Sequence, residues 1–260
     1  AHRCTQIMRT CAALCVISAV SAQRGRTSAH YHTYDSLEYW DEQIDDAAAV
    51  TEWLGDYHRF EDAIRPTVAR DADVLVVGAG RSELSAQMHE DGYSRLVNVD
   101  FSARTVDLMK ARRPEQRWLL ADARRMPQVE TAAYDAVLDK ACFDTMYAGG
   151  VWRAIDGTLN KDALPLVPGR LRAYVAEASR VLRPGGKLLL ISHQEPADAI
   201  KYLNNRSRGW GIDDIQVLAA PPDAARANER AHRIFIATKS TWAASEPGDE
   251  SAAEGGAESK

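Results

Sequence analysis

The sequence predicts an α/β fold in which a doubly wound, mostly parallel sheet of seven strands ends in an antiparallel hairpin. Two observations carry this prediction. Between Val74 and Ser192, short apolar runs alternate with helical patterns, which is the order of a parallel sheet covered by helices. Beyond Ser192, two strand-like runs are separated only by a Pro- and Ala-rich link, which indicates an antiparallel pair.

Each element can be placed from its pattern. The first helix carries Leu84 and Met88 on one face and stops at Gly92, and the second begins after a Ser102 cap. A longer helix before the fifth strand has an apolar stripe from Leu171 to Leu182. The seven strands are predicted at 74–77, 96–100, 118–122, 134–139, 187–192, 212–219 and 233–238.

The loop between the first strand and its helix contains Gly78 and Gly80. Glycines allow the backbone to approach a ligand closely, and the helix that follows offers free N–H groups in its first turn. Asp100, at the end of the second strand, is placed to accept hydrogen bonds from ribose hydroxyls. This Rossmann-like segment predicts a site for an adenosine-bearing cofactor, with a tight turn that binds no ligand as the alternative.

The residue three places after the second glycine discriminates among such cofactors. A dinucleotide fingerprint has a small residue there, where helix and strand pack tightly, but this chain has Glu83. The Lys-Ser or Lys-Thr pair of a triphosphate loop is also missing after the glycines. An S-adenosylmethionine site requires the ribose-binding acid but no diphosphate cradle, so the sequence favours S-adenosylmethionine.

Length and composition indicate one ordinary folded domain. The chain has 260 residues, of which 45% are hydrophobic and 27% charged. A net charge of −5 without a dense run of Lys or Arg gives no electrostatic reason to expect nucleic acid. No stretch approaches the roughly 20 apolar residues needed to span a bilayer, so we expect no membrane insertion. We also expect a monomer and no bound metal.

The two ends of the chain differ from its middle. Residues 1–33 contain no acid, four arginines and an apolar run, and they resemble a signal peptide or an organelle transit peptide; without such targeting we expect a cytoplasmic protein. Residues 241–260 are rich in Ala, Gly, Glu and Ser and are predicted to be a disordered acidic tail. The folded domain is therefore expected at 34–240, where Cys142 is the one cysteine and no disulfide framework is possible.

Several segments resemble the seven-stranded class I methyltransferases, which use S-adenosylmethionine. The matching segments are VVGAG, NVDFS, ADARRMP, YDAVLDK and EASRVLRPGGKLLLIS. The resemblance implies that Asp122 accepts from the adenine amino group and that the backbone of Ala123 donates to the adenine ring. One departure is Val76, where many members of the family carry an acid.

Further segments, EYWDEQ, TEWLGDYHRF and VLDKACFDTMYAG, resemble the methyltransferase-like group that includes the translation elongation factor 1-alpha lysine methyltransferases. The resemblance extends over about 34–192 and implies protein-lysine methylation of a protein substrate such as an elongation factor. Ile44 replaces an expected tyrosine, and Asp139-Lys140-Ala141 replaces Glu-Lys-Gly. The cofactor contacts that the resemblance implies are Trp40, Trp53, Gly78, Asp100, Phe101, Asp122, Ala123 and Lys140.

Methyl transfer is an in-line displacement at an activated carbon, so the protein mainly positions the nucleophile. A lysine nucleophile, with an ordinary pKa of about 10.4, must first lose a proton. Asp139 and Asp144 are the candidates for aligning the amine, and His193 is a third. The alternative for the aspartates is a salt bridge with Lys140, and the alternative for His193 is a place in a solvated turn. An indole face attracts a cation by about 0.5 to 2 kcal/mol, so the two tryptophans are candidates for a lid or simply for the core.

Two other functions are compatible with the same core. A small-molecule methyltransferase uses the same fold, and the tryptophan segments are the main feature against it. A non-catalytic member of the family would bind the cofactor and serve as an interaction protein. The long segment 149–169, between the fourth strand and its helix, favours a protein or peptide substrate.

Overall fold

The computed structural model describes residues 34, 36–45, 52–148, 166–204, 209–219 and 232–241. The predicted leader, nearly all of the predicted tail and most of the segment 149–169 lie outside these residues.

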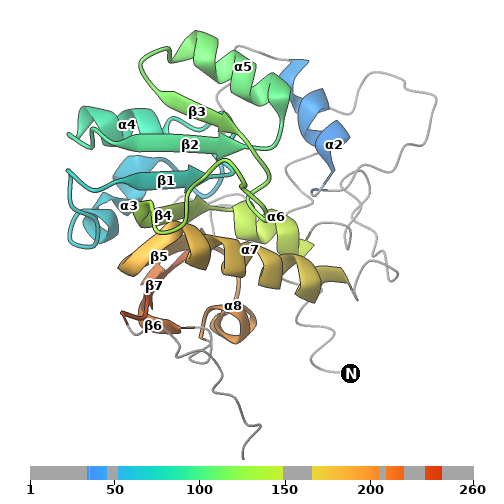
Figure 1. The fold of residues 1–260 in the computed structure, drawn as a ribbon. Coiled ribbons are helices and arrows are strands. Elements are labelled where there is room, and N and C mark those ends of the chain that lie inside the picture. The colour runs from blue at the N-terminus through green and yellow to red at the C-terminus, as the bar shows by residue number, and fades with distance from the viewer. Residues whose placement is uncertain are drawn as a thin grey trace, which may run out of the picture.

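One seven-stranded sheet forms the centre of the fold, with the strand order β3-β2-β1-β4-β5-β7-β6 (Figure 1). Strands β1 to β5 are parallel to one another, whereas β7 is antiparallel to both β5 and β6. The predicted fold class is therefore confirmed, including the final hairpin. The strands are β1 (Val74–Val77), β2 (Leu96–Asp100), β3 (Arg117–Leu120), β4 (Tyr134–Lys140), β5 (Leu182–Ser192), β6 (Trp210–Leu218) and β7 (His232–Lys239).

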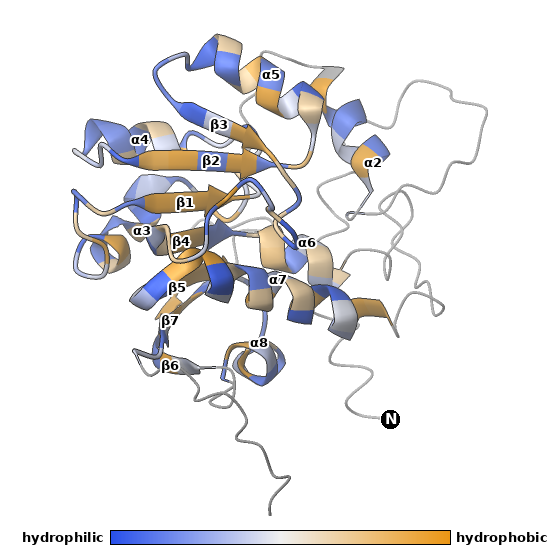
Figure 2. Cartoon of the chain, in the orientation of Figure 1, coloured by the Kyte–Doolittle hydropathy of each residue, from blue (hydrophilic) through white to orange (hydrophobic). Residues whose placement is uncertain are grey.

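Helices cover both faces of the sheet and enclose two apolar cores. Successive side chains of a strand point to opposite faces, so Val74 and Val76 join one core while Leu75 and Val77 join the other. Apolar residues of α3, α4 and α5 pack on the first face, and those of α6, α7 and α8 on the second. Figure 2 shows the resulting concentration of hydrophobic residues along β1 and β2.

The helices are short except for one. They are α2 (Leu37–Glu42), the 3-10 helix η2 (Gln43–Asp45), α3 (Tyr57–Ile64), α4 (Leu84–Glu90), α5 (Ala103–Arg112), α6 (Cys142–Ala148), α7 (Val167–Val181) and α8 (Pro196–Leu203). None of the helices in the described ranges is both long enough and apolar enough to cross a bilayer.

Several elements differ from the sequence prediction. Helices α2, α3 and α6 were not predicted, and β3 ends at Leu120 instead of at residue 122. Strand β5 starts at Leu182, which pairs with Tyr134, and regular pairing resumes at Lys187 after a turn in which Gly185 has φ +81°. The helix α8 was not predicted, because only Ala199 and Leu203 mark its buried face. These differences leave the order and direction of the strands unchanged.

The point where the strand order reverses, between β1 and β4, fixes the place of the site. In open α/β sheets, ligands bind beyond the carboxyl ends of the strands at such a reversal. The glycine loop follows β1, and Asp100 and Lys140 are the last residues of β2 and β4. The topology therefore brings three of the predicted site segments to one edge of the sheet.

Candidate cofactor-binding site

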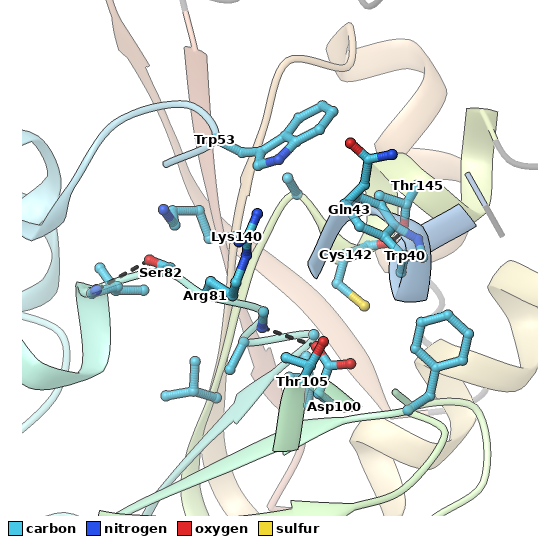
Figure 3. A pocket seen from close by; sticks show the side chains of 18 of the residues that line it. Trp40, Gln43, Trp53, Arg81, Ser82, Asp100, Thr105, Lys140, Cys142 and Thr145 are labelled. Carbon is cyan, nitrogen blue, oxygen red and sulfur yellow. Dashed lines mark hydrogen bonds between the residues drawn. The ribbon is translucent and has the colours of Figure 1, made fainter. Parts of the chain in front are cut away.

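A cavity of about 250 Å³ opens at this edge of the sheet (Figure 3). Its walls come from the N-terminal segment that includes α2, from the glycine loop, from the end of β2 and from the junction of β4 with α6. Seven of the residues predicted to contact the cofactor line it: Trp40, Trp53, Gly78, Gly80, Asp100, Phe101 and Lys140.

The glycine loop has a backbone conformation that suits glycine. Gly78 and Gly80 have φ values of +59° and +56°, in the left-handed region that other residues rarely adopt. A Cβ atom on Gly78 would lie 2.6 Å from both Cβ and Sγ of Cys142, at the start of α6. The loop is therefore closely packed against α6 while its other side borders the cavity.

Asp100 is buried, with 7% of its surface exposed, and is fixed by two backbone groups. The N–H of Gly80 donates to Oδ2 at 2.9 Å, and the N–H of Ser102 donates to Oδ1 at 2.9 Å. Burial raises the pKa of Asp100, and these hydrogen bonds oppose the rise. Each carboxylate oxygen retains a further lone pair, so the group can also accept from two hydroxyls.

Lys140 and Glu52 form an ion pair across one wall of the cavity. The Lys140 ammonium also donates to the carbonyl oxygen of Gly55 at 2.8 Å. Glu52 accepts in addition from the Ser82 hydroxyl at 2.9 Å and from the Glu83 N–H at 2.6 Å. Burial lowers the pKa of Lys140, and the carboxylate of Glu52 opposes this. Glu52 thus ties the N-terminal segment to both β4 and the start of α4.

Sequence reasoning did not single out Glu52. Its one signal was its place in the segment TEWLGDYHRF, directly before Trp53. The partner, Lys140, is 88 residues away in the sequence, so no local pattern could show the ion pair.

Aromatic side chains close the cavity on the N-terminal side. The rings of Trp40 and Trp53 meet edge to face with centroids 5.9 Å apart, and Tyr39 packs against Trp40 at 5.0 Å. The indole N–H of Trp40 donates to the carbonyl oxygen of Tyr34 at 2.7 Å. Both tryptophans are partly buried against the core and also line the cavity (Figure 3), so the two predicted alternatives, core and lid, are not exclusive.

Helix α2, which carries Trp40, is attached to the turn after β2. The Ser102 hydroxyl donates to Asp41 Oδ1 at 2.5 Å, and the Arg104 guanidinium donates to the carbonyl oxygen of Asp41 at 2.7 Å. Ser102 also accepts from the Thr105 N–H at 3.0 Å and thereby caps α5, as predicted. One turn thus fixes Asp100, α5 and α2 together.

Asp122 and Ala123 lie outside the set of described residues that line the cavity. Asp122 follows the end of β3 and pairs with Arg124, whose Nη2 lies 2.6 Å from Oδ2 and whose Nε lies 2.9 Å from Oδ1. Although burial disfavours its charge, the hydrogen bonds from Arg124 hold the pKa of Asp122 below its ordinary value. The guanidinium of Arg124 therefore already pairs with the carboxylate that was predicted to bind adenine.

The Asp139 carboxylate is fully buried at the β4–α6 junction. It accepts from the N–H groups of Cys142 at 2.8 Å and Phe143 at 3.0 Å, so it caps α6. Burial raises the pKa of Asp139 to about 7, and the nearby Asp144 adds to the rise while the N–H groups oppose it. The predicted salt bridge between Asp139 and Lys140 is not formed, since the carboxylate of Glu52 takes the lysine.

Asp144 and His193 are brought together by α6 and the end of β5. The Asp144 Oδ2 atom lies 3.3 Å from His193 Nδ1, and the Ser192 hydroxyl donates to Asp144 Oδ1 at 2.6 Å. Neither residue lines the cavity, although Thr145, the neighbour of Asp144, does. In the described part of the chain, no group of three or more His, Cys, Asp or Glu residues is suited to bind a metal.

Sheet order, glycine loop and buried strand-end acid together are typical of the class I methyltransferase fold. A family model described as a methyltransferase domain matches residues 75–190. Solved structures show the same fold at low identity. A methyltransferase from Methanosarcina mazei aligns with a TM-score of 0.53 and 14% identity, over 68% of this chain and 97% of that one. Geranyl diphosphate C-methyltransferase from Streptomyces coelicolor aligns with a TM-score of 0.52 and 17% identity, over 78% and 96%.

Within this class, the chain is similar to methyltransferases named for elongation factor 1A. It is 28% identical to EEF1A lysine methyltransferase 4 of Mus musculus over 187 residues, which are 69% of each chain. It is 29% identical to the eEF1A lysine and N-terminal methyltransferase of Mus musculus over 205 residues, which are 76% of this chain but 27% of that protein.

Proposed function

We propose that the chain is a protein-lysine N-methyltransferase that uses S-adenosylmethionine as the methyl donor. The observation that carries the proposal is the cavity at the sheet reversal, with the buried Asp100 at its base and two tryptophans at its N-terminal wall. The named relatives act on lysine of elongation factor 1A, which supports a protein substrate and makes that factor the first one to test.

The residues present suit S-adenosylmethionine. Asp100 retains acceptor capacity for the ribose hydroxyls, and the loop that carries Gly78 and Gly80 borders the cavity, where its backbone can lie against a ligand. The indole faces of Trp40 and Trp53 attract a sulfonium by about 0.5 to 2 kcal/mol. When bound, the cofactor supplies a methyl group activated by its positive sulfur.

Lys140, Gly80 and Phe101 complete the proposed contacts, and Asp122 and Ala123 hold the adenine if Arg124 moves away from the carboxylate. The chain itself then binds the cofactor, excludes water with the aromatic wall and aligns the amine for in-line attack. Part of the proposed acceptor side, 149–165, lies outside the described residues.

The proposal is tested by incubating the protein with radiolabelled S-adenosylmethionine and either a cell extract or purified elongation factor 1A. We expect a labelled protein band whose methyl group is located on lysine by mass spectrometry. Asp100→Asn should lower the affinity for S-adenosylhomocysteine by more than about tenfold, because a charged acceptor of the ribose hydroxyls is lost. Asp107→Asn, on the exposed side of α5, is the matched control and should leave it unchanged.

The other outcomes separate the alternatives. A labelled small product would indicate a small-molecule methyltransferase. Binding of S-adenosylhomocysteine without any transfer would indicate a non-catalytic cofactor-binding protein. A preference for NAD over S-adenosylhomocysteine would overturn the cofactor assignment itself.

A further inference from the structure

Asp144 and His193 form a buried pair beside the cavity. The side chain of Asp144 is 2% exposed and that of His193 is 14% exposed. Besides the 3.3 Å contact with the imidazole Nδ1, Asp144 accepts from the Ser192 hydroxyl and, at 3.4 Å, from the N–H of His193. Contacts to both the ring and the backbone of His193 fix the orientation of the imidazole.

The sheet register places this pair next to the cofactor cavity. Strands β4 and β5 are parallel, with Lys140 opposite Ile191, and the N–H of Ala141 donates to the carbonyl oxygen of Ile191 at 3.0 Å. The chain after Ile191 therefore runs beside the β4–α6 junction, where Cys142 and Thr145 line the cavity. The pair borders the β5 side of that wall.

The Nε2 atom of His193 is buried and has no hydrogen-bond partner among the described residues. An unsatisfied buried polar atom costs about 1 to 3 kcal/mol, so such atoms in folded proteins call for a ligand or another specific role. Because a carboxylate faces Nδ1, the neutral ring carries its proton on Nδ1 and offers the lone pair of Nε2. This is the arrangement of a base that is oriented by a carboxylate.

The charges around His193 suit a cationic substrate. Asp144 on α6 faces the ring. Asp139 on β4 interacts with Asp144, but burial raises its pKa to about 7, so it carries only part of a charge at neutral pH. From β7, Arg233 donates to the carbonyl oxygen of His193 at 3.4 Å, and its guanidinium is neutralised by Glu195 at 2.8 Å. The remaining negative charge attracts an ammonium group.

We propose that His193 is the general base of the methyl transfer and that Asp144 is its positioning residue; this rests on the proposed lysine methyltransferase function. Because Nε2 is buried and His193 lies outside the cavity lining, the substrate lysine must displace the groups that cover this atom. Nε2 then accepts a proton from the substrate ammonium, and the freed nitrogen lone pair attacks the methyl carbon. The N–C bond forms as the C–S bond breaks, and the electron pair of that bond converts the sulfonium to a neutral thioether. The imidazolium, stabilised by Asp144, then returns its proton to water.

The test compares His193→Asn and Asp144→Asn with His89→Asn, a matched control on the exposed last turn of α4. With saturating cofactor and protein acceptor, we expect His193→Asn to lower kcat about 100-fold at neutral pH. The loss should shrink as the pH approaches about 10.4, where the substrate amine deprotonates without help. Asp144→Asn should lower kcat less, and His89→Asn should leave it unchanged.

Two measurements separate this role from a structural one. Calorimetric titration with S-adenosylhomocysteine should give a Kd for His193→Asn within about twofold of the unsubstituted protein, since the cofactor contacts are intact. The ¹⁵N spectrum of the ring should show the proton of His193 on Nδ1 in the unsubstituted protein, and a loss of that preference in Asp144→Asn.

The results that overturn the proposal are distinct from a failure of the proposed function. If the unsubstituted protein transfers methyl groups, but His193→Asn leaves kcat and its pH profile unchanged, then His193 is not the general base and the proposed function still stands. A tautomer of His193 that does not respond to Asp144→Asn would remove the positioning role. Absence of any transfer to protein by the unsubstituted chain would overturn the function, and the base with it.

Discussion

At the scale of single residues, the buried carboxylates of this fold have different tasks because they have different hydrogen-bond partners. Asp100 accepts from the loop after β1 and faces the cavity, whereas Asp139 accepts from the first N–H groups of α6. Both lie at or next to the carboxyl end of a parallel strand, where a carboxylate meets free N–H groups of the adjacent loops and helix. Of the two carboxylates, only Asp100 lines the cavity that a ligand can enter.

The raised pKa of Asp139 gives a prediction about stability and pH. A carboxyl group whose pKa is about 7 in the folded chain, against an ordinary value of 3.8, binds its proton more tightly when folded. Its contribution to stability is therefore greatest below pH 4 and is lost as the pH rises to 7. We expect Asp139→Asn, which stays neutral, to gain stability relative to the unsubstituted protein between pH 5 and 8, by on the order of 1 to 4 kcal/mol.

Urea unfolding at pH 5 and pH 8 measures this difference. Asp135→Asn, on the same strand, is the matched control. Although burial disfavours its charge, the guanidinium of Arg183 holds the pKa of Asp135 below its ordinary value. That group stays ionised over the whole interval, so the effect of its substitution should not vary with pH. If the stability difference caused by Asp139→Asn is equally independent of pH, the assignment of a raised pKa to Asp139 is contradicted.

At the scale of elements, the seven strands and the helices α4, α5 and α7 could be predicted because their signals are local. Alternating apolar runs, the Ser102 cap and the stop at Gly92 each act within a few residues. The glycine loop and Asp100 were predictable for the same reason, since one strand and its turn set their relation. Helix α8 escaped prediction because a helix of eight residues with Ala199 and Leu203 as its buried positions has a weak apolar pattern.

The contacts that assemble the cavity wall are not local, and the sequence pattern did not predict them. The ion pair of Glu52 with Lys140 joins segments that only the tertiary fold brings together, and so does the hydrogen bond of Ser102 with Asp41. The engagement of Asp122 by Arg124 is close in sequence, and the two arginines that follow Asp122 were a signal for this ion pair that the motif did not take into account. The sequence motifs thus located the sheet edge at which the site lies, whereas the hydrogen-bond and ion-pair partners of its residues depend on tertiary packing.

The Glu52 ion pair gives a prediction about the N-terminal segment. The Lys140 side chain is 5% exposed, so Glu52→Gln would leave a buried ammonium without its counter-charge. We expect a loss of about 1 to 3 kcal/mol in the free energy of unfolding, because the partner is itself 23% exposed and solvent screens part of the effect. The affinity for S-adenosylhomocysteine should also fall several-fold, since Trp53 follows Glu52 directly.

Glu61→Gln is the matched control for this substitution. Glu61 on α3 is 24% exposed and pairs with Arg65, which is 40% exposed, so its loss should cost less than about 1 kcal/mol. Urea unfolding and calorimetric titration compare the two variants. Equal effects of both substitutions on stability and on affinity would show that Glu52 does not hold the cavity wall together.

At the scale of the whole molecule, the candidate site depends on segments from distant parts of the chain. The cavity joins α2 and Trp53 to the ends of β1, β2 and β4, while β6 and β7 lie at the far edge of the same sheet. Because a ligand that contacts all of these walls holds them in one arrangement, binding should suppress local opening in each of them.

Hydrogen exchange with and without S-adenosylhomocysteine measures this coupling. We expect slower amide exchange in 36–45, in 52–55 and in the glycine loop, at ligand concentrations about 100 times Kd, where binding adds about 2.7 kcal/mol to stability. Exchange from locally open states in the β6–β7 hairpin should change least, because the hairpin contributes no residue to the described cavity wall. Protection confined to the glycine loop would show instead that the N-terminal segment packs on the domain without taking part in the site, and the two tryptophans would then belong to the core alone.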